Sequence, residues 1–469
     1  MKLGLIDSSI LFAYLALMIG LGLYANYRQK GVEDYFVAGR RMGPFTIACL
    51  WLAAWVGGAA VVGSAARSYE LGVTGVWYVA SLAMGCLLFG LFMSARVKEM
   101  GDRHGHLTYP DFVEERFDGR TRVVATITTV LAYVAYSAGQ LVASAAILQV
   151  LLGWDYNTAL LVASGIVIVY TATGGYLAVT YTDWVQFILL LVGIVLIGVP
   201  IAIQETGGPA ALQQALPPSY FDLGAQGWSS ITALVASIVL SFFVAMDSYS
   251  RCFAARDPQA ARRGTLLAVL FMLPLAVASV WLGLSSAVLF PDAEASNGIL
   301  TLFVLETFPV GLKGLVLVGI LAAVMSSADI CILTASANYT RDIHQRFIQP
   351  DIQPKAMLRL SMLASVVAGG LAMLMAWKMQ DIIGILQLGF TINSAALFLP
   401  TIAAIYFRRV TATAAFWSII LSLLTVIGWR LASDLGLGGP FGIDPLWPGL
   451  LVSATSLLLI QALRRPATA

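Results

Sequence analysis

Two adjacent serines in a long apolar stretch offer oxygen atoms that suit a hard cation. The stretch reads Ala323-Val324-Met325-Ser326-Ser327-Ala328-Asp329, so the serines follow Ala323 by three and four residues. In a helix this spacing puts both hydroxyls on the same face as Ala323. Hydroxyl and carbonyl oxygens are ligands that a hard cation such as sodium prefers, so the segment predicts an ion site. The alternative is that the serines only bond to the preceding turn or a neighbouring helix.

Two adjacent glycines interrupt another apolar stretch, which reads Ala53-Ala54-Trp55-Val56-Gly57-Gly58-Ala59-Ala60. Helix continuity is weak at such a pair. An unwound turn frees backbone carbonyls, and these are tolerated at bilayer depth only where they line a cavity or bind an ion. The alternative interpretation is close helix packing through small residues.

Three carboxylates lie in or beside apolar stretches. Asp329 is expected to be functional, because a carboxylate inside a membrane is costly and usually faces the bundle interior. Asp183, in Thr182-Asp183-Trp184-Val185-Gln186, is either functional or the N-cap of a helix. Asp247 either lines a binding site or pairs with Arg251 near the membrane interface.

The elements that carry these residues are membrane-spanning helices. Of the 469 residues, 59% are hydrophobic and 11% are charged, whereas soluble domains carry about 25% charged residues. We therefore predict an all-α polytopic membrane protein with about thirteen transmembrane helices. They are expected near residues 5–26, 45–69, 73–95, 122–152, 156–177, 182–204, 229–254, 262–290, 310–340, 355–378, 380–407, 411–431 and 446–464.

Basic residues orient these spans, because cytoplasmic loops retain an excess of Lys and Arg. Of the 27 basic residues, five fall on the side assigned to the outside: Lys2, Arg67, Lys313, Lys378 and Arg430. This distribution predicts an N-terminus outside, a C-terminus inside and a multi-pass location in the inner (plasma) membrane of a cell. The sequence contains no G-x-x-x-x-G-K-[ST] phosphate loop, and its loops are too short for a soluble enzyme. Neither an enzyme nor a nucleic-acid partner is expected, and membrane lipid surrounds the chain.

Five segments carry a resemblance to a known family: Asp34-Tyr35-Phe36-Val37-Ala38-Gly39-Arg40-Arg41-Met42-Gly43-Pro44, Tyr170-Thr171-Ala172-Thr173-Gly174-Gly175-Tyr176, Thr182-Asp183-Trp184-Val185-Gln186, Ala322-Ala323-Val324-Met325-Ser326-Ser327-Ala328-Asp329 and Tyr339-Thr340-Arg341-Asp342-Ile343. On these segments the sequence resembles the sodium/solute symporter family, which includes the proline, pantothenate, sodium/galactose, sialic acid and choline transporters. The resemblance implies a single transporter domain over residues 1–469. Within it, 45–204 and 229–407 form two inverted five-helix repeats with broken helices, spans 2–6 and 7–11. A first peripheral span and loop occupy 5–44, and two further peripheral spans occupy 411–464.

The resemblance also implies that the ion is Na⁺ and that it is bound where the residues alone suggest. Its ligands would be three backbone carbonyls and two hydroxyls: those of Ala53, Val56, Ala323, Ser326 and Ser327. A second ion site or an exit path is implied at Asp183 and Asp329. Some family members carry a hydroxyl where this chain has Ile330, which has no side-chain oxygen, so the ion stoichiometry stays open.

The resemblance to the family does not identify a single solute. The closest likeness within the family is to the choline-transporter branch, through Trp55-Val56-Gly57-Gly58 and residues 322–329. It places Trp55 and Tyr136 at the substrate site, where aromatic rings can hold a quaternary ammonium by cation–π attraction. Gly57 and Asp247 are the other two expected substrate residues. Ala245 departs from this pattern, since that branch has a tryptophan there.

Symport of a small organic solute by alternating access is therefore expected, with an amine or quaternary ammonium compound as the candidate substrate. An amino acid, a sugar or a carboxylate, and coupling to protons, stay open. No Arg or Lys is expected deep in spans 2, 4 or 7, so half-helix N-termini would have to bind an anionic solute. The alternatives from other classes are a membrane solute sensor with a separate signalling partner, and a channel.

Overall fold

The computed structural model shows a bundle of helices. It describes residues 4–28, 40–293, 296–407, 409–434 and 442–463, without the side chains of residues 15, 18, 19, 21–28, 170, 173–184 and 434. Apart from one bridge between Met42 and Ala255, the described residues form helices and their connections. Ten of the described helices are long and apolar enough to cross a membrane. The all-α membrane architecture is thus confirmed, whereas the count of about thirteen spans stays a prediction.

The helices follow one another with short connections, including the 3₁₀ turns Gly72–Gly75, Pro218–Phe221 and Ser296–Gly298. The first half of the chain forms α1 (Leu5–Arg28), α3 (Pro44–Trp55), α4 (Gly58–Leu71), α5 (Val76–Phe92), α6 (Ser94–His104), α7 (Tyr109–Arg116), α8 (Gly119–Leu152), α9 (Tyr156–Leu190), the π-helix η3 (Leu191–Gly198), α10 (Val199–Thr206) and α11 (Pro209–Ala215). The second half forms α12 (Trp228–Phe242), α13 (Met246–Ala254), α14 (Pro258–Leu289), α15 (Ile299–Thr307), α16 (Leu312–Ala337), the π-helix η6 (Asn338–Ile348), α17 (Pro354–Lys378), α18 (Ile382–Tyr406), α19 (Ala412–Asp434) and α20 (Leu446–Leu463).

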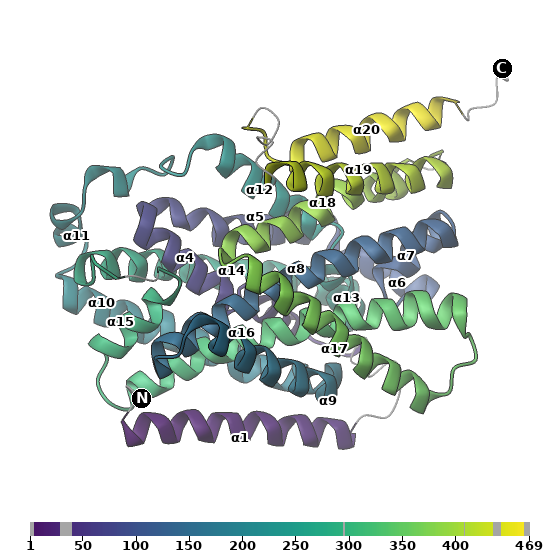
Figure 1. The fold of residues 1–469 in the computed structure, drawn as a ribbon. Helices are drawn as coiled ribbons and strands as arrows, with labels where there is room; N and C mark the ends of the chain where they lie inside the picture. The colour runs from purple at the N-terminus through teal and green to yellow at the C-terminus, as the bar shows by residue number, and fades with distance from the viewer. Residues whose placement is uncertain (1–3, 29–39, 294–295, 408, 435–441, 464–469) are drawn as a thin grey trace.

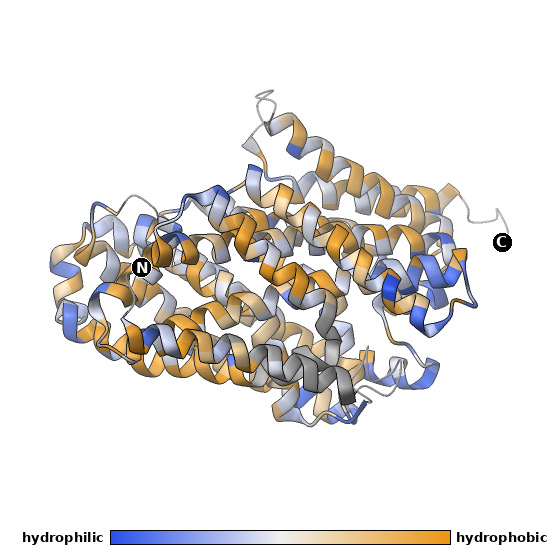
Figure 2. Cartoon of the chain, turned by 60° about the horizontal axis from the view of Figure 1, so that its bottom comes forward, coloured by the Kyte–Doolittle hydropathy of each residue, from blue (hydrophilic) through white to orange (hydrophobic). Residues whose placement is uncertain are grey.

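Helix α16 is the centre of the bundle. In its most apolar window 94% of residues are buried, against 39% in α19 and 22% in α20. Figure 1 shows α1 along one edge of the bundle and α19 beside α20 along the opposite edge. In Figure 2, apolar residues cover the length of the helices and hydrophilic residues gather at the two ends of the bundle. This distribution suits a molecule whose middle lies in lipid.

One connection differs from the sequence prediction. Spans at 156–177 and 182–204 are expected to be separated by a turn, but α9 runs through residues 178–181 to Leu190. The four intervening residues, Ala178-Val179-Thr180-Tyr181, include neither Gly nor Pro, so nothing in them ends a helix locally. The side chain of Asp183 and the segment 34–39, both part of the family resemblance, lie outside the described residues.

Local signals fix the helix starts at the loops. Asp118, Asp155 and Asp257 cap α8, α9 and α14, each accepting a hydrogen bond from the N–H three residues later. Thr108 and Asp111 form a reciprocal capping box at the start of α7. Such caps accept hydrogen bonds from first-turn backbone N–H groups, which have no partner within the helix.

Candidate ion and solute site

The second predicted span is broken between α3 and α4. Helix α3 ends at Trp55, after which Val56 (φ −105°, ψ 47°) and Gly57 (φ −68°, ψ 176°) leave the helical conformation. The last carbonyls of α3 therefore have no following turn to bond to. The unwound turn lies where the glycine pair predicts it.

The two glycines also let α16 approach this turn closely. A Cβ atom on Gly57 would lie 1.7 Å from Ser327 Oγ, and one on Gly58 would lie 2.1 Å from Val324 Cγ2. The two interpretations of the glycine pair are thus both realised, because close packing by small residues brings α16 onto the unwound turn.

Oxygen atoms from the two helices meet at this contact. The Ser327 hydroxyl lies 2.8 Å from the carbonyl oxygen of Ala53 and 3.1 Å from that of Ala323, and both carbonyls accept from it. The Ser326 hydroxyl also donates to the Ala323 carbonyl, at 3.0 Å. All of these residues are buried, and the carbonyl of Val56 belongs to the same unwound turn. If the hydroxyl hydrogens of Ser326 and Ser327 rotated away, the oxygen lone pairs would face a cation between the two helices.

Asp329 lies one helical turn beyond Ser326 and is buried. Its carboxylate accepts a hydrogen bond from the hydroxyl of Thr171 in α9. The neighbouring Ile330 is buried as well. The structure thus places a hydroxyl from another helix beside Asp329, which the sequence interpretation did not include.

An aromatic cavity of about 30 Å³ lies beside the unwound turn. Trp55, Tyr136 and Asp247, three of the predicted substrate residues, line it together with Ala54, Tyr78, Gln140, Cys331, Leu386 and Phe390. A cavity of this volume holds about one water molecule. The ring of Phe390 stacks on Trp55 at 5.8 Å and lies 4.8 Å from Tyr136. The indole N–H of Trp55 is buried and has no hydrogen-bond partner among the described residues.

The seventh predicted span is also broken, at a point that no glycine or proline in the sequence marks. Helix α12 ends at Phe242 and α13 begins at Met246, with residues 243–245 between them. The junction contains neither Gly nor Pro, and it is held from outside, since the Asp247 N–H donates to the Tyr133 hydroxyl at 3.0 Å. The one local signal is a carboxylate directly after an apolar run.

Arg251 lies three residues before the end of the seventh predicted span and is buried inside the bundle. Its side chain is fully buried, and its Nη1 lies 3.4 Å from Asp247 Oδ1. Its Nε donates to the carbonyl of Leu50 at 2.9 Å, and its guanidinium lies 5.7 Å from the ring of Trp51. These contacts offset the cost of burying the cation. Asp247 therefore both lines the cavity and pairs with Arg251.

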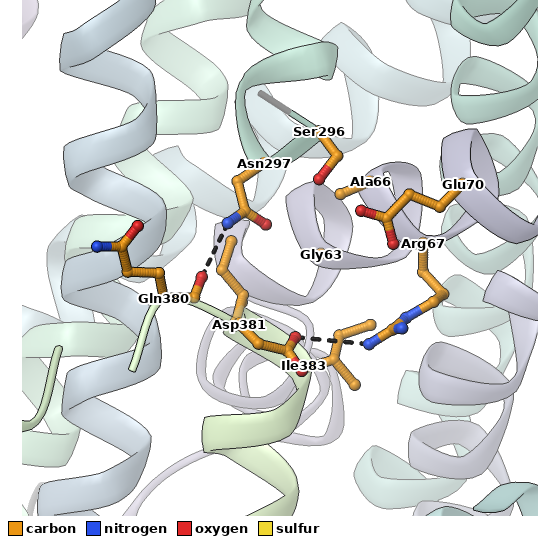
Figure 3. A pocket seen from close by; sticks show the side chains of 10 residues that line it. Gly63, Ala66, Arg67, Glu70, Ser296, Asn297, Gln380, Asp381 and Ile383 are labelled. Carbon is orange, nitrogen blue, oxygen red and sulfur yellow. Dashed lines mark hydrogen bonds and ion pairs between the residues drawn. The ribbon is translucent and has the colours of Figure 1, made fainter. Parts of the chain in front are cut away.

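A larger pocket of about 340 Å³ opens above α4 and the start of α18. Figure 3 shows Arg67 and Asp381 pointing toward one another across it, 3.5 Å apart. On the other side the amide of Asn297 donates to the backbone carbonyl of Gln380 at 2.8 Å. The pocket lies at the end of the bundle that the charge distribution assigns to the outside.

Ion pairs connect three helices at the opposite end of the bundle. Arg122 of α8 contacts carboxylates from two other helices: Asp111 and Glu114 of α7, and Asp342 of η6. From η6, Arg341 also pairs with Asp111, and Arg346 pairs with Glu114. Burial raises the pKa of Asp111, but Arg341 and Arg122 together with backbone N–H donors outweigh it, so this pKa lies below its ordinary value.

Comparison with known proteins shows which family this chain matches. Residues 35–422 match the family described as the sodium:solute symporter family. The chain belongs to the sodium:solute symporter family. It is therefore a multi-pass membrane transporter that couples a small solute to sodium, and it is not an enzyme.

Its relatives span the whole chain at low identity. The high-affinity proline transporter of Bacillus subtilis is 25% identical, over 95% of this chain and 96% of its own. The sodium/pantothenate symporter of Escherichia coli is 26% identical, over 96% and 95%. A substrate-bound, outward-open Na⁺-coupled sialic acid symporter superposes with a TM-score of 0.79 at 22% identity, over 99% of this chain and 98% of its own. A nucleobase-cation-symport-1 family transporter superposes with a TM-score of 0.58 at 15% identity, over 93% and 96%.

Proposed function

We propose that this symporter binds its sodium ion between the unwound turn and α16. The ligands are the carbonyls of Ala53, Val56 and Ala323 and the hydroxyls of Ser326 and Ser327. The observation that carries this assignment is the contact of Ser327 with Ala53, because it brings carbonyl and hydroxyl oxygens from two helices to one buried point. Oxygen ligands of this kind suit sodium.

The solute in this proposal is a compact compound with a positively charged amine, and it binds at the aromatic cavity, which must widen beyond its present volume of about 30 Å³ to take it. Trp55 and Tyr136 offer ring faces, and Asp247 supplies a carboxylate. Because Asp247 is shared with Arg251, the rings rather than a full negative charge select the cation. The unpartnered indole N–H of Trp55 offers one further donor to the solute.

A carboxylate-bearing solute is the second candidate. Asp247 lies in the first turn of α13 and lines the cavity, so the N-terminus of a half-helix faces the solute. Relatives named for pantothenate and for sialic acid favour this candidate. An amino acid would satisfy both ends of such a site.

The finer architecture belongs to the same proposal. Residues 45–204 and 229–407 form two inverted repeats, which is supported by a broken helix at the start of each: α3 with α4, and α12 with α13. About thirteen spans, with the N-terminus outside, follow from the apolar windows and the basic residues. Asp183 and Asp329 mark a second ion site or an exit path.

Uptake into proteoliposomes tests the function. We expect a labelled amine solute to accumulate only with an inward sodium gradient, saturably, and not when potassium replaces sodium. Equal uptake in potassium would contradict sodium coupling, and non-saturable flux would indicate a channel. A thermal-shift series of amines, amino acids, sugars and carboxylates, with and without sodium, then ranks the solutes, because a ligand stabilises the state it binds.

A further inference from the structure

Two histidines and a glutamate form a cluster that transport chemistry does not use. His104 ends α6, and Gly105, at φ 70°, turns the chain so that His106 follows on the same side. The two imidazole rings lie 5.5 Å apart, at 74° to each other. Glu115, in the last turn of α7, reaches both rings with one carboxylate. The cluster lies at the same end of the bundle as the ion pairs around Arg122.

The donor atoms converge. His106 Nε2 lies 2.6 Å from one Glu115 oxygen, and His104 Nδ1 contacts the other. All three ligand atoms lie within 4.8 Å of one another. Donors around a four-coordinate zinc, each about 2.0–2.2 Å from the metal, stand at comparable separations. Small side-chain rotations would therefore suffice to bring them onto one ion.

We propose that His104, His106 and Glu115 form a binding site for a divalent transition metal of the Zn²⁺ class. Two imidazoles and one carboxylate are a ligand set that zinc accepts, with a fourth position left for water. His106 is buried whereas His104 and Glu115 are partly exposed, so an ion can enter from solution and meet one fixed ligand.

The backbone around the site is fixed before any metal binds. Arg40 donates to the carbonyl oxygen of His106 at 2.8 Å. The His106 N–H bonds to the carbonyl of Gly101 at 3.1 Å, and the N–H groups of Leu107 and Thr108 bond to Asp111. A preorganised loop lowers the entropy lost on binding. His106 Nδ1 has no acceptor among the described residues, so we expect micromolar rather than nanomolar affinity.

A bound ion would join α6 to α7. Helix α7 carries Asp111 and Glu114, which pair with Arg122 of α8, so the ion would add a link from α6 to a helix that is already tied to α8. Resting on the proposed alternating-access function, we expect Zn²⁺ to slow sodium-driven uptake. This effect is separable from metal binding itself, which needs no transport.

Equilibrium dialysis of purified protein against Zn²⁺ tests the site. We expect one Zn²⁺ per chain, and at least tenfold weaker binding in His106→Ala, His104→Ala and Glu115→Gln. His344→Ala is the matched control, because His344 is the third histidine of the chain and is not part of the cluster. Glu115→Gln keeps the side-chain shape, so its loss of binding cannot be ascribed to unfolding, and a sodium-dependent thermal shift verifies each variant.

The outcomes are distinct. Equal binding by the wild type and all three cluster variants, or a loss in His344→Ala, would overturn the site. Zn²⁺ could bind as expected and still slow uptake by the wild type and by Glu115→Gln equally. That result would refute the proposed effect of the ion on transport, and the metal site itself would remain supported. Failure of sodium-driven uptake in metal-free protein would count against the proposed function alone.

Discussion

Ser327 Oγ lies 2.8 Å from the carbonyl oxygen of Ala53, a residue 274 positions earlier in the chain. This contact joins the most buried helix of the bundle to the one place where α3 and α4 are unwound. A sodium ion bound there would contact both helices at once, so its arrival and departure would change how they hold together.

Removing a hydroxyl at this contact should weaken sodium binding. We expect Ser326→Ala and Ser327→Ala each to lower apparent sodium affinity roughly tenfold or more, since a hydrogen bond or ligand contact to a charged group is worth about 1.5–3 kcal/mol. The measurement is sodium activation of uptake. Ser286→Ala is the control, because Ser286 is a buried serine of α14 that bonds back to Leu282. Unchanged sodium activation in both test variants would remove the serines from the site.

A methyl group at Gly57 should be far more harmful than one elsewhere. The added Cβ in Gly57→Ala would overlap Ser327 Oγ, so we expect loss of sodium-dependent uptake and a lower thermal midpoint. In Gly370→Ala of α17 the Cβ meets nothing within 4 Å, and helix propensity should add about 0.5–1 kcal/mol of stability. Similar behaviour of the two variants would contradict the close approach of α16.

Trp55 should control solute affinity more than sodium affinity. We expect Trp55→Ala to weaken solute binding by about 2 kcal/mol for a desolvated cation, and Trp55→Phe to retain part of it. Sodium binding without solute should change little. Isothermal titration of each ligand separates the two. Trp417→Ala, at an exposed position of α19, is the matched control, and normal solute affinity in Trp55→Ala would place the pocket elsewhere.

The ion pairs of Asp111 with Arg122 and Arg341 should stabilise the folded protein over a defined pH range. Its pKa is lowered in the folded state, so its contribution is complete above the ordinary value of about 3.9 and is lost as the pH falls through the lowered pKa. We expect Asp111→Asn to lower the free energy of unfolding by a constant amount between pH 5 and 8, on the order of 1–3 kcal/mol. The measurement is the thermal midpoint at each pH, which should fall with it. The exposed Asp351→Asn should have no such effect. A difference that already vanishes near pH 6 would refute the assignment.

The parts of the site that the sequence predicts are those with short-range signals. Gly57 and Gly58 weaken a helix wherever they occur, so the break after Trp55 follows from the sequence. The spacing of Ser326 and Ser327 from Ala323 gives their common face directly, because helical periodicity is local. These signals do not depend on which helices surround the segment.

The parts that the sequence misses depend on packing between distant segments. Residues 243–245 carry no helix-breaking signal, and Tyr133 holds the start of α13 through Asp247. The pairing of Arg251 with Asp247 is local, but its burial depends on Leu50 and Trp51 of α3, which meet it only in the folded bundle. Phe390 reaches the cavity from α18, and no pattern in its own helix indicates that position. Tertiary context thus decides both the second break and half of the cavity.

The burial of all four cysteines gives the wild-type protein a natural chemical reporter. Cys49, Cys86, Cys252 and Cys331 are all buried, and Cys331 alone among them lines the aromatic cavity. If the solute occupies this cavity as proposed, a small thiol reagent that follows the solute would reach Cys331 before the other three cysteines. Protection of Cys331 from alkylation would report occupancy of the cavity in the unmutated chain, without a label on the solute and without a cysteine-free background.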